Sequence, residues 1–170
     1  NALGYYSAAV RISESMLVLP VVITSTLFPA ILRSKERSES LYIDRVLYLY
    51  RLIVSLAFAT SAAIFLFRGE VVSLIFGDGY SPSASIIAIY VWANVFVFLN
   101  NASWQWHIAE NLQKLALQRL FLGAAINILL NFIWIDRFGS IGAAYATIIS
   151  YSVSGYFGNF LTERTRPNFY

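Results

Sequence analysis

Residues 5–31 read YYSAAVRISESMLVLPVVITSTLFPAI, a stretch long and apolar enough to cross a membrane as a helix. Arg11 and Glu14 nevertheless lie inside it, and Pro20 and Pro29 predict bends. A charge at the centre of a bilayer costs roughly 2.5–3.5 kcal/mol on insertion scales. We therefore expect the polar side of this segment to face the interior of a helix bundle or a water-filled cavity.

The composition of the chain is typical of an integral membrane protein. Of its 170 residues, 58% are hydrophobic and 12% are charged, and the mean hydropathy is +0.63. Soluble domains carry about 45–50% apolar and about 25% charged residues. The chain has no cysteine, which excludes disulfides, thiolate metal sites and cysteine nucleophiles. It begins at Asn1 and shows no signal-peptide pattern, so we expect it to be a piece of a longer protein.

Five apolar segments predict five transmembrane helices, because each is near the ~20 residues that a helix needs to cross ~30 Å of hydrocarbon. Short polar connections separate the segments, and no repeat or soluble domain is evident. The expected fold class is an all-α integral membrane protein with a single membrane domain over residues 1–170. The predicted helices cover residues 3–32, 47–67, 83–108, 115–135 and 141–161.

The basic residues of the connections predict the topology. Only Arg68 and Arg137 fall on one side of the membrane, whereas nine Lys and Arg residues fall on the other. Short loops rich in Lys and Arg stay in the cytoplasm. The N-terminus is therefore predicted to be periplasmic and the C-terminus cytoplasmic. The nine residues are Arg33, Lys35, Arg37, Arg45, Arg51, Lys114, Arg119, Arg164 and Arg166.

The first predicted helix carries its polar residues on one face. Arg11 and Glu14 are three residues apart and can pair. Ser7 and Ser15 lie four residues before and four after Arg11, on the same stripe. Two interpretations stay open: a structural ion pair that holds helices together, or a cavity lining that meets a substrate or a coupling ion.

Amide side chains form similar stripes on two later helices. Asn94, Asn101 and Gln105 share one face of the helix predicted over residues 83–108. Asn127 and Asn131 are four residues apart on the next helix. Such amides either line a cavity or form hydrogen bonds between helices, which contribute ~1 kcal/mol or less each.

Two further features concern packing. Ala146, Ser150, Ser154 and Gly158 are spaced four apart, and small residues at that spacing let another helix approach closely. His107 is the single histidine, and its position near the cytoplasmic end predicts an interfacial residue.

Several motifs are absent from the sequence. It contains no GxxxxGK[ST] phosphate loop, no HExxH metal site and no GxSxG elbow. We therefore expect no catalytic residue, no metal and no cofactor, and the protein is predicted not to be an enzyme. Any transport would run on an H+ or Na+ gradient, on the membrane potential, or downhill.

Three segments resemble a known family. LGYYSAAVRISESMLVLPVVITSTLFPAI, LIFGDGYSPSA and INILLNFIWIDRFGSIGAAYATIISY occur in this order, and together they span most of the chain. They are similar to segments of bacterial polysaccharide and O-antigen flippases, which belong to the multidrug/oligosaccharidyl-lipid/polysaccharide exporter superfamily. Arg11 and Glu14 match the arginine and the glutamate of the family's YSAAxRxxE pattern.

The resemblance implies a fold and a function. The chain would form most of one lobe, the C-terminal one, of a two-lobed transporter whose other lobe is missing here. The protein would move undecaprenyl-diphosphate-linked oligosaccharide from the cytoplasmic to the periplasmic leaflet of the bacterial inner membrane by alternating access, in polysaccharide or lipopolysaccharide biosynthesis. Its partners would be this lipid-linked oligosaccharide, membrane lipids, the other lobe and polysaccharide polymerase machinery, with no nucleic acid. The implied substrate-cavity residues are Ser7, Arg11, Glu14, Ser15, Asn94, Asn101, Gln105, Asn127 and Asn131.

Alternatives remain open at this point. Within the superfamily, the protein would be a lipid II flippase or a cation-coupled drug antiporter, with Glu14 as a proton or sodium site. A membrane-embedded glycan polymerase or ligase is another class, but it would need large outer loops with catalytic residues, and the outer loops here are short. A structural membrane scaffold is the last alternative.

Overall fold

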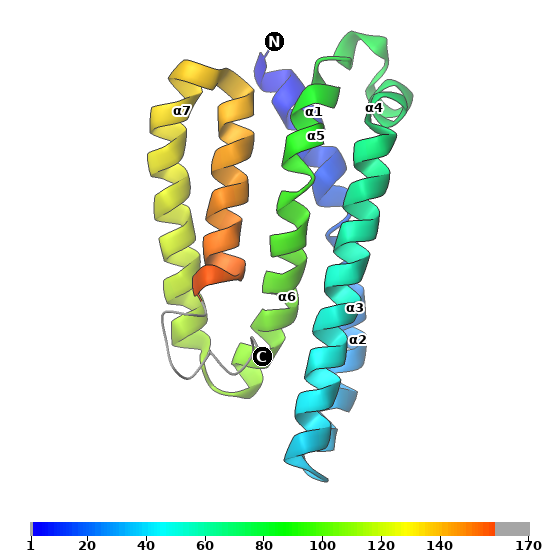
Figure 1. Ribbon diagram of the computed structural model, residues 1–170, viewed down its shortest axis with the longest axis vertical. Helices are drawn as coiled ribbons and strands as arrows, with labels where there is room; N and C mark the ends of the chain where they lie inside the picture. Colours follow the sequence, from blue (N-terminus) through cyan, green and yellow to red (C-terminus); the bar gives the residue numbers. More distant parts are fainter. Residues whose placement is uncertain (1, 159–170) are drawn as a thin grey trace.

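The computed structural model describes residues 2–158, and every regular element in that range is helical (Figure 1). Part of the helix predicted over residues 141–161, as well as Arg164 and Arg166, lies outside the described residues. The elements in chain order are α1 (Ala2–Ser15), α2 (Val18–Lys35), α3 (Glu39–Leu66), α4 (Arg68–Phe76), η1 (Asp78–Tyr80), α5 (Ser83–Tyr90), α6 (Ala93–Ala109) and α7 (Gln113–Gly155).

Several of these helices can cross a membrane. Three stretches among the described residues are long and apolar enough, 2–35, α3 and α7, and a fourth is added if the bent pair α5 and α6 counts as one span. Large apolar side chains also cover the outside of the bundle; Phe132 is 82% exposed and Phe121 is 72% exposed. By this criterion the chain is an all-α membrane protein with three or four candidate spans, and the number of five spans stays a prediction.

Helix α7 folds back on itself at Gly139. This residue has φ 57° and ψ −138°, a backbone conformation that glycine adopts without steric cost. Figure 1 shows the two arms of α7, yellow and orange, side by side and antiparallel. The helices predicted over residues 115–135 and 141–161 correspond to these two arms.

The helix predicted over residues 3–32 is two helices, separated at Met16 and Leu17. Pro20 explains where the break falls, since a proline lacks an N–H and its ring clashes with the carbonyl four residues earlier, which here is that of Met16. The Met16 carbonyl accepts from the Leu19 N–H instead, at 3.1 Å. Pro29, by contrast, lies inside α2 without interrupting it.

A second break separates α5 from α6 at Val91 and Trp92, with a bend of 42°. No proline or glycine causes it. The Val91 carbonyl accepts from the Asn94 N–H at 3.1 Å and also from Ser61 Oγ of α3 at 3.0 Å, so a buried side chain adds a second hydrogen bond at the break. The helix predicted over residues 83–108 is therefore also discontinuous.

Helix α3 begins at Glu39, eight residues before the predicted start at residue 47. Ser38 caps it, with Oγ accepting from the Leu41 N–H at 3.5 Å. The first turns contain charged residues, which lowers their hydropathy, but Tyr42 and Val46 are buried against α2 and α6. Packing on one face thus extends the helix past its apolar segment.

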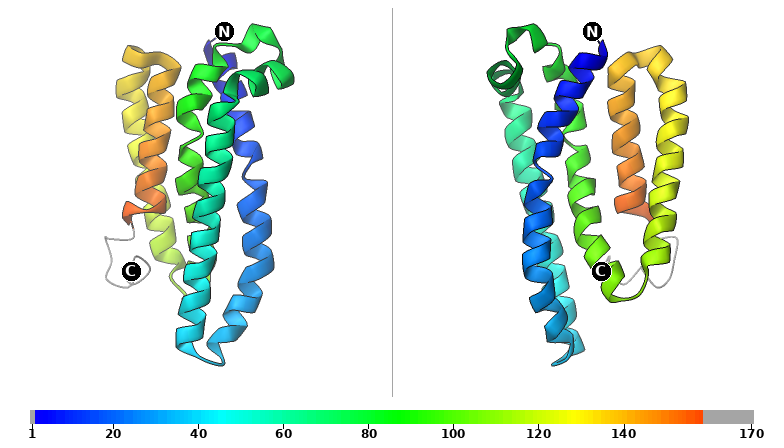
Figure 2. Two further views of the ribbon diagram at one scale, coloured as in Figure 1. Left: turned by 45° about the vertical axis from the view of Figure 1, so that its right-hand side comes forward. Right: turned by 180° about the vertical axis from the view of Figure 1, so that it is seen from behind.

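Two clusters form the core. One joins α2, α3 and α6 around Ile53 and Phe98, and the other joins α1, α4, α5 and α7 around Ile87 and Ala144. Figure 2 shows from two further sides that α1 and α2 run as one bent rod beside α3 and α6. The two discontinuous helices, α1–α2 and α5–α6, therefore pack against each other.

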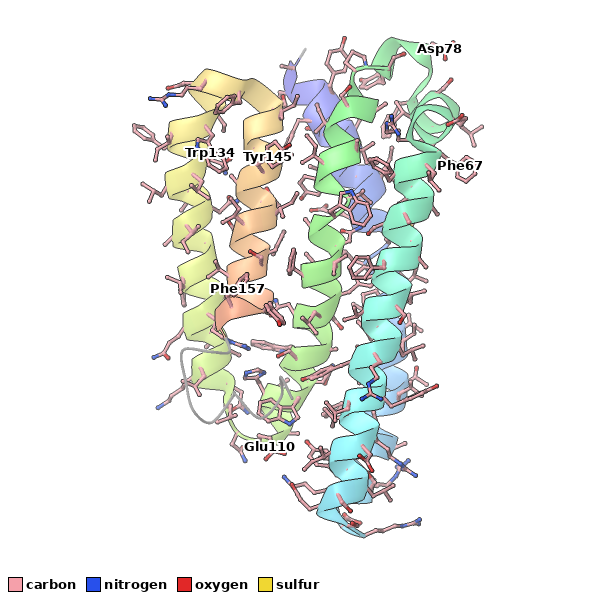
Figure 3. All side chains as sticks on the ribbon, viewed as in Figure 1. Phe67, Asp78, Glu110, Trp134, Tyr145 and Phe157 are labelled. Atoms are coloured by element: carbon pink, nitrogen blue, oxygen red, sulfur yellow. The ribbon has the colours of Figure 1, made fainter. Side chains whose placement is uncertain are left out.

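The connections alternate between the two ends of the bundle. The α2–α3 and α6–α7 connections share one end, where Lys35 Nζ forms an ion pair with Glu110 Oε1 at 2.7 Å. Figure 3 shows Glu110 at this end and Asp78 at the other. We call the first the basic end, because it carries Arg33, Lys35, Arg37, Arg45 and Lys114. The alternation is the one that the loop charges predict, and the orientation of the basic end toward the cytoplasm stays a prediction.

Candidate functional site: the polar face of α1 and a cavity against α7

The polar residues of α1 are exposed. Ser7, Arg11, Glu14 and Ser15 all have exposed side chains, and Ser15 Oγ donates to the Ile12 carbonyl at 2.7 Å. Arg11 and Glu14 do not form the ion pair that their spacing allows, since Lys35–Glu110 is the single ion pair among residues 2–158. The interpretation of these two charges as a structural pair is therefore wrong for this part of the chain. Their polar face lies open on the outside of the bundle.

A cavity of about 350 Å³ lies between the end of α5 and the two arms of α7. Leu120, Gly123 and Ala124 form its apolar side. The polar lining residues are Tyr90, Asn127, Thr147, Ser150, Tyr151 and Ser154. These hydroxyl and amide groups can both donate and accept hydrogen bonds.

Helix α1, which carries the polar face, lies beside this cavity. It packs against α5. The ring of Tyr6 on α1 also lies edge-on to the ring of Tyr90, which lines the cavity, with the ring centroids 5.9 Å apart. The helix that carries the polar face therefore adjoins the cavity.

Asn127 and Asn131 lie on the first arm of α7. Asn127 lines the cavity, and Asn131 Nδ2 donates to Asn127 Oδ1 at 2.9 Å. The Oδ1 atom of Asn131 is buried and has no hydrogen-bond partner among the described residues. The pair thus holds the Asn127 side chain in place from within its own helix.

Asn94 and Asn101 of α6 tie helices together instead of lining the cavity. Ser13 Oγ donates to Asn94 Oδ1 at 3.0 Å, and Asn94 Nδ2 donates to the Ser13 carbonyl at 3.2 Å. Thr24 Oγ1 approaches Asn101 Oδ1 at 2.9 Å. Gln105 is half-buried on α6 and is not among the cavity residues. Of the five predicted amides, the structure therefore brings one, Asn127, to the cavity wall.

The two arms of α7 pack closely where the small residues predict a close approach. A Cβ atom on Gly123 would lie 2.9 Å from Ser154 Cβ and 3.0 Å from the Ser150 carbonyl oxygen. This contact places Ser150 and Ser154 in the cavity wall. The four-residue spacing was a usable signal for these residues, whereas nothing in the sequence pointed to Tyr90 or Tyr151.

A buried polar cluster lies toward the basic end. His107 is fully buried and Arg119 is 5% exposed, so the prediction of an interfacial histidine is wrong, and Arg119 is not a loop residue. Arg119 Nη2 lies 3.3 Å from His107 Nδ1. Arg119 Nε and Nη1, as well as His107 Nε2, have no hydrogen-bond partner among the described residues.

The fold and the site define a class: an all-α membrane protein with discontinuous helices and a polar cavity beside an exposed charged face. The chain is 25% identical over 153 residues to a "Probable low-salt glycan biosynthesis flippase" of Haloferax volcanii, a match that covers 89% of this chain and 32% of that protein. It is 26% identical over 118 residues to an uncharacterized membrane protein of Methanocaldococcus jannaschii, covering 69% of this chain and 23% of the relative.

The chain is thus similar to a glycan biosynthesis flippase and to a further archaeal membrane protein. The chain spans about a third or less of the length of the curated relatives it matches. No protein-family model matches the chain, and no solved structure matches it significantly. Both relatives come from archaea, so the bacterial inner membrane expected from the resemblance stays a prediction.

Proposed function

We propose that this chain is part of a flippase that moves a polyprenyl-diphosphate-linked oligosaccharide across the cytoplasmic membrane, from the cytoplasmic to the outer leaflet. The observation that carries the proposal is the exposed polar face of α1, which adjoins a polar cavity in a chain similar to a glycan biosynthesis flippase. Charged residues within membrane segments face a bundle interior or a water-filled cavity. The exposed face of α1 is thus expected to meet further helices of the full-length protein across a shared cavity.

The chemistry of the residues suits this substrate. A diphosphate–sugar headgroup cannot cross hydrocarbon without replacing the water that hydrates it. The guanidinium of Arg11 is a planar fork that binds phosphate oxygens bidentately. Tyr90, Asn127 and Tyr151 offer hydroxyl and amide groups for sugar hydroxyls, while the polyprenyl tail stays in the lipid.

Two lobes would give alternating access. In this proposal α1–α2, α3, α5–α6 and the two arms of α7 are five crossings that belong to one lobe, with the N-terminus outside and the basic end in the cytoplasm. Broken helices commonly form the binding sites of transporters whose two halves rock about a central site. The breaks at Met16 and Val91 support this assignment.

A cation-coupled transporter is the second candidate. It is favoured by Glu14, an exposed carboxylate on α1 that forms no ion pair within the described residues. Such a carboxylate can bind H+ or Na+ during a transport cycle. Transport that requires Glu14 and an imposed cation gradient would distinguish coupled transport from downhill flipping.

A reconstitution experiment tests the proposal. The full-length protein is placed in proteoliposomes with a fluorescent polyprenyl-diphosphate oligosaccharide, and an impermeant reagent destroys the label in the outer leaflet. We expect loss of nearly all fluorescence with the protein and of about half without it, since the unassisted lipid does not cross. Equal losses in the two samples would contradict the proposal.

A further inference from the structure

Three arginines surround a second cavity at the basic end. This cavity is about 280 Å³, roughly nine times the ~30 Å³ share of a water molecule. Arg33 comes from the last turn of α2, Arg37 from the connection and Arg45 from the second turn of α3. The α2–α3 hairpin therefore brings together three guanidinium groups from two helices and the connection between them. Ala30, Ser34 and Glu36 complete the lining.

The three guanidinium groups have few partners. None of them forms an ion pair within residues 2–158, although Glu36, Glu39 and Asp44 are close in the sequence. In the described part of the chain, their single side-chain hydrogen bond runs from Arg45 Nη1 to the Ala30 carbonyl at 3.5 Å, which is long. Glu36 offsets part of the positive charge and leaves the lining with a net positive charge. The cavity thus presents unused donors and charge of one sign.

General rules account for only part of this arrangement. Basic residues accumulate on the cytoplasmic side of membrane proteins, and a cation in the last turn of α2 complements the helix dipole. Neither rule requires that Arg45, which belongs to the next helix, face the same hollow as Arg33. Lys35, which the same rules cover, is paired with Glu110 and lies outside the cavity lining.

We propose that this cavity binds the phosphate of an anionic membrane lipid headgroup. Basic pockets between membrane helices on the cytoplasmic side suit such headgroups, and guanidinium forks match phosphate oxygens. The surrounding surface suits acyl chains, because apolar side chains nearby on α2 and α3 are exposed, including Leu32 at 40% and Ile43 at 48%. The site is separate from the cavity against α7, and the proposal does not depend on the transport function.

The test measures the binding of soluble lipids to the full-length protein in detergent. Thermal unfolding is followed while dioctanoyl phosphatidylglycerol, dioctanoyl phosphatidylcholine, inorganic phosphate or diphosphate is added in separate titrations. We expect phosphatidylglycerol to raise the unfolding midpoint in a saturable way, because a ligand that binds the folded state stabilises it. Phosphatidylcholine and both soluble anions should bind at least fivefold more weakly.

Arg45→Gln and Arg51→Gln provide a matched pair, since both arginines are exposed on α3 but only Arg45 lines the cavity. Arg45→Gln should weaken phosphatidylglycerol binding about fivefold, the equivalent of about 1 kcal/mol. Arg33→Gln should have a similar effect, and Arg51→Gln should change the affinity by less than twofold. Equal losses at Arg45 and Arg51 would show unspecific surface attraction and would overturn the proposal. Phosphate or diphosphate binding as tight as the lipid would also overturn it, by identifying a soluble anion as the ligand.

Discussion

Ser13 and Asn94 exchange two hydrogen bonds, of 3.0 and 3.2 Å, between α1 and α6. Ser13 lies three residues before the break at Met16, and Asn94 lies three residues after the break at Val91. The two discontinuous rods are therefore joined at their breaks. Ser61 adds a contact from α3 to the same place.

A double-mutant cycle measures the hydrogen bond between Ser13 Oγ and Asn94 Oδ1, because Ser13→Ala keeps the Ser13 carbonyl that accepts the other bond. Ser13→Ala, Asn94→Ala and the double variant should give a coupling free energy of about 0.6 kcal/mol and at most about 1.7 kcal/mol, the range found for side-chain hydrogen bonds in membrane proteins. The free energy of unfolding of the full-length protein in mixed micelles provides the measurement. A coupling energy of zero would show that the two residues act independently.

Replacement of Pro20 should make the helix more continuous across the break between α1 and α2. In Pro20→Ala, the new N–H can donate to the Met16 carbonyl, so amide hydrogens of residues 12–22 should exchange more slowly. Hydrogen–deuterium exchange with mass spectrometry would record the change. Pro29→Ala is the control, because Pro29 does not interrupt α2, and it should leave exchange in residues 12–22 unaltered. Unchanged or faster exchange in Pro20→Ala would contradict this cause of the break.

Close packing of α7 against α6 depends on Gly155. A Cβ atom there would lie 2.6 Å from the Phe96 carbonyl oxygen, so Gly155→Ala should force the helices apart and lower the free energy of unfolding by about 1–3 kcal/mol. Gly4→Ala on α1 meets nothing within 4 Å and should not be destabilising. Thermal unfolding of the two variants side by side makes the comparison, and similar midpoints would count against this packing.

The buried charge of Arg119 should cost stability. Arg119→Met keeps much of the side-chain volume and removes a guanidinium with two nitrogens that have no partner among residues 2–158, so the free energy of unfolding should rise by about 1 kcal/mol or more. The free energy of unfolding of Arg119→Ala should be lower than that of Arg119→Met, because the alanine leaves a cavity beside Gly158. The unfolding midpoints of both variants test this order. A strongly destabilised Arg119→Met would reveal an acceptor for Arg119 beyond residues 2–158.

Hydropathy and charge were sufficient to predict the helical membrane fold and the alternation of its connections. Both hydropathy and loop charge are properties of the local composition, so they can be read directly from the sequence. The break at Val91 could not be predicted, because no proline or glycine marks it, and the side chain that bonds to its carbonyl, Ser61, lies thirty residues away in the sequence. The early start of α3 likewise depends on packing of Tyr42 and Val46.

The candidate site was predicted in part. The spacing of Arg11 and Glu14 placed them on one polar face, and the structure leaves that face exposed. Helical periodicity could not distinguish an amide that lines a cavity from one that bonds to a neighbouring helix, so Asn94 and Asn127 looked alike. Their different roles depend on which helix lies opposite each of them, and this is a property of the tertiary structure.

In the proposed mechanism, the charges on the polar face of α1 act on the lipid-linked glycan. The double variant Arg11→Ala with Glu14→Ala, produced in cells that depend on the protein for surface glycan, tests this role. Surface glycan and the amount of protein in the membrane are measured together. Arg51→Ala, which removes an exposed charge on α3, is the control.

Because neither residue is buried or ion-paired among the described residues, the double variant should reach the membrane in normal amounts. We predict that its surface glycan falls at least tenfold, while the Arg51→Ala control keeps a normal level. Normal surface glycan from the double variant at a normal protein level would contradict the account and remove Arg11 and Glu14 from the transport path.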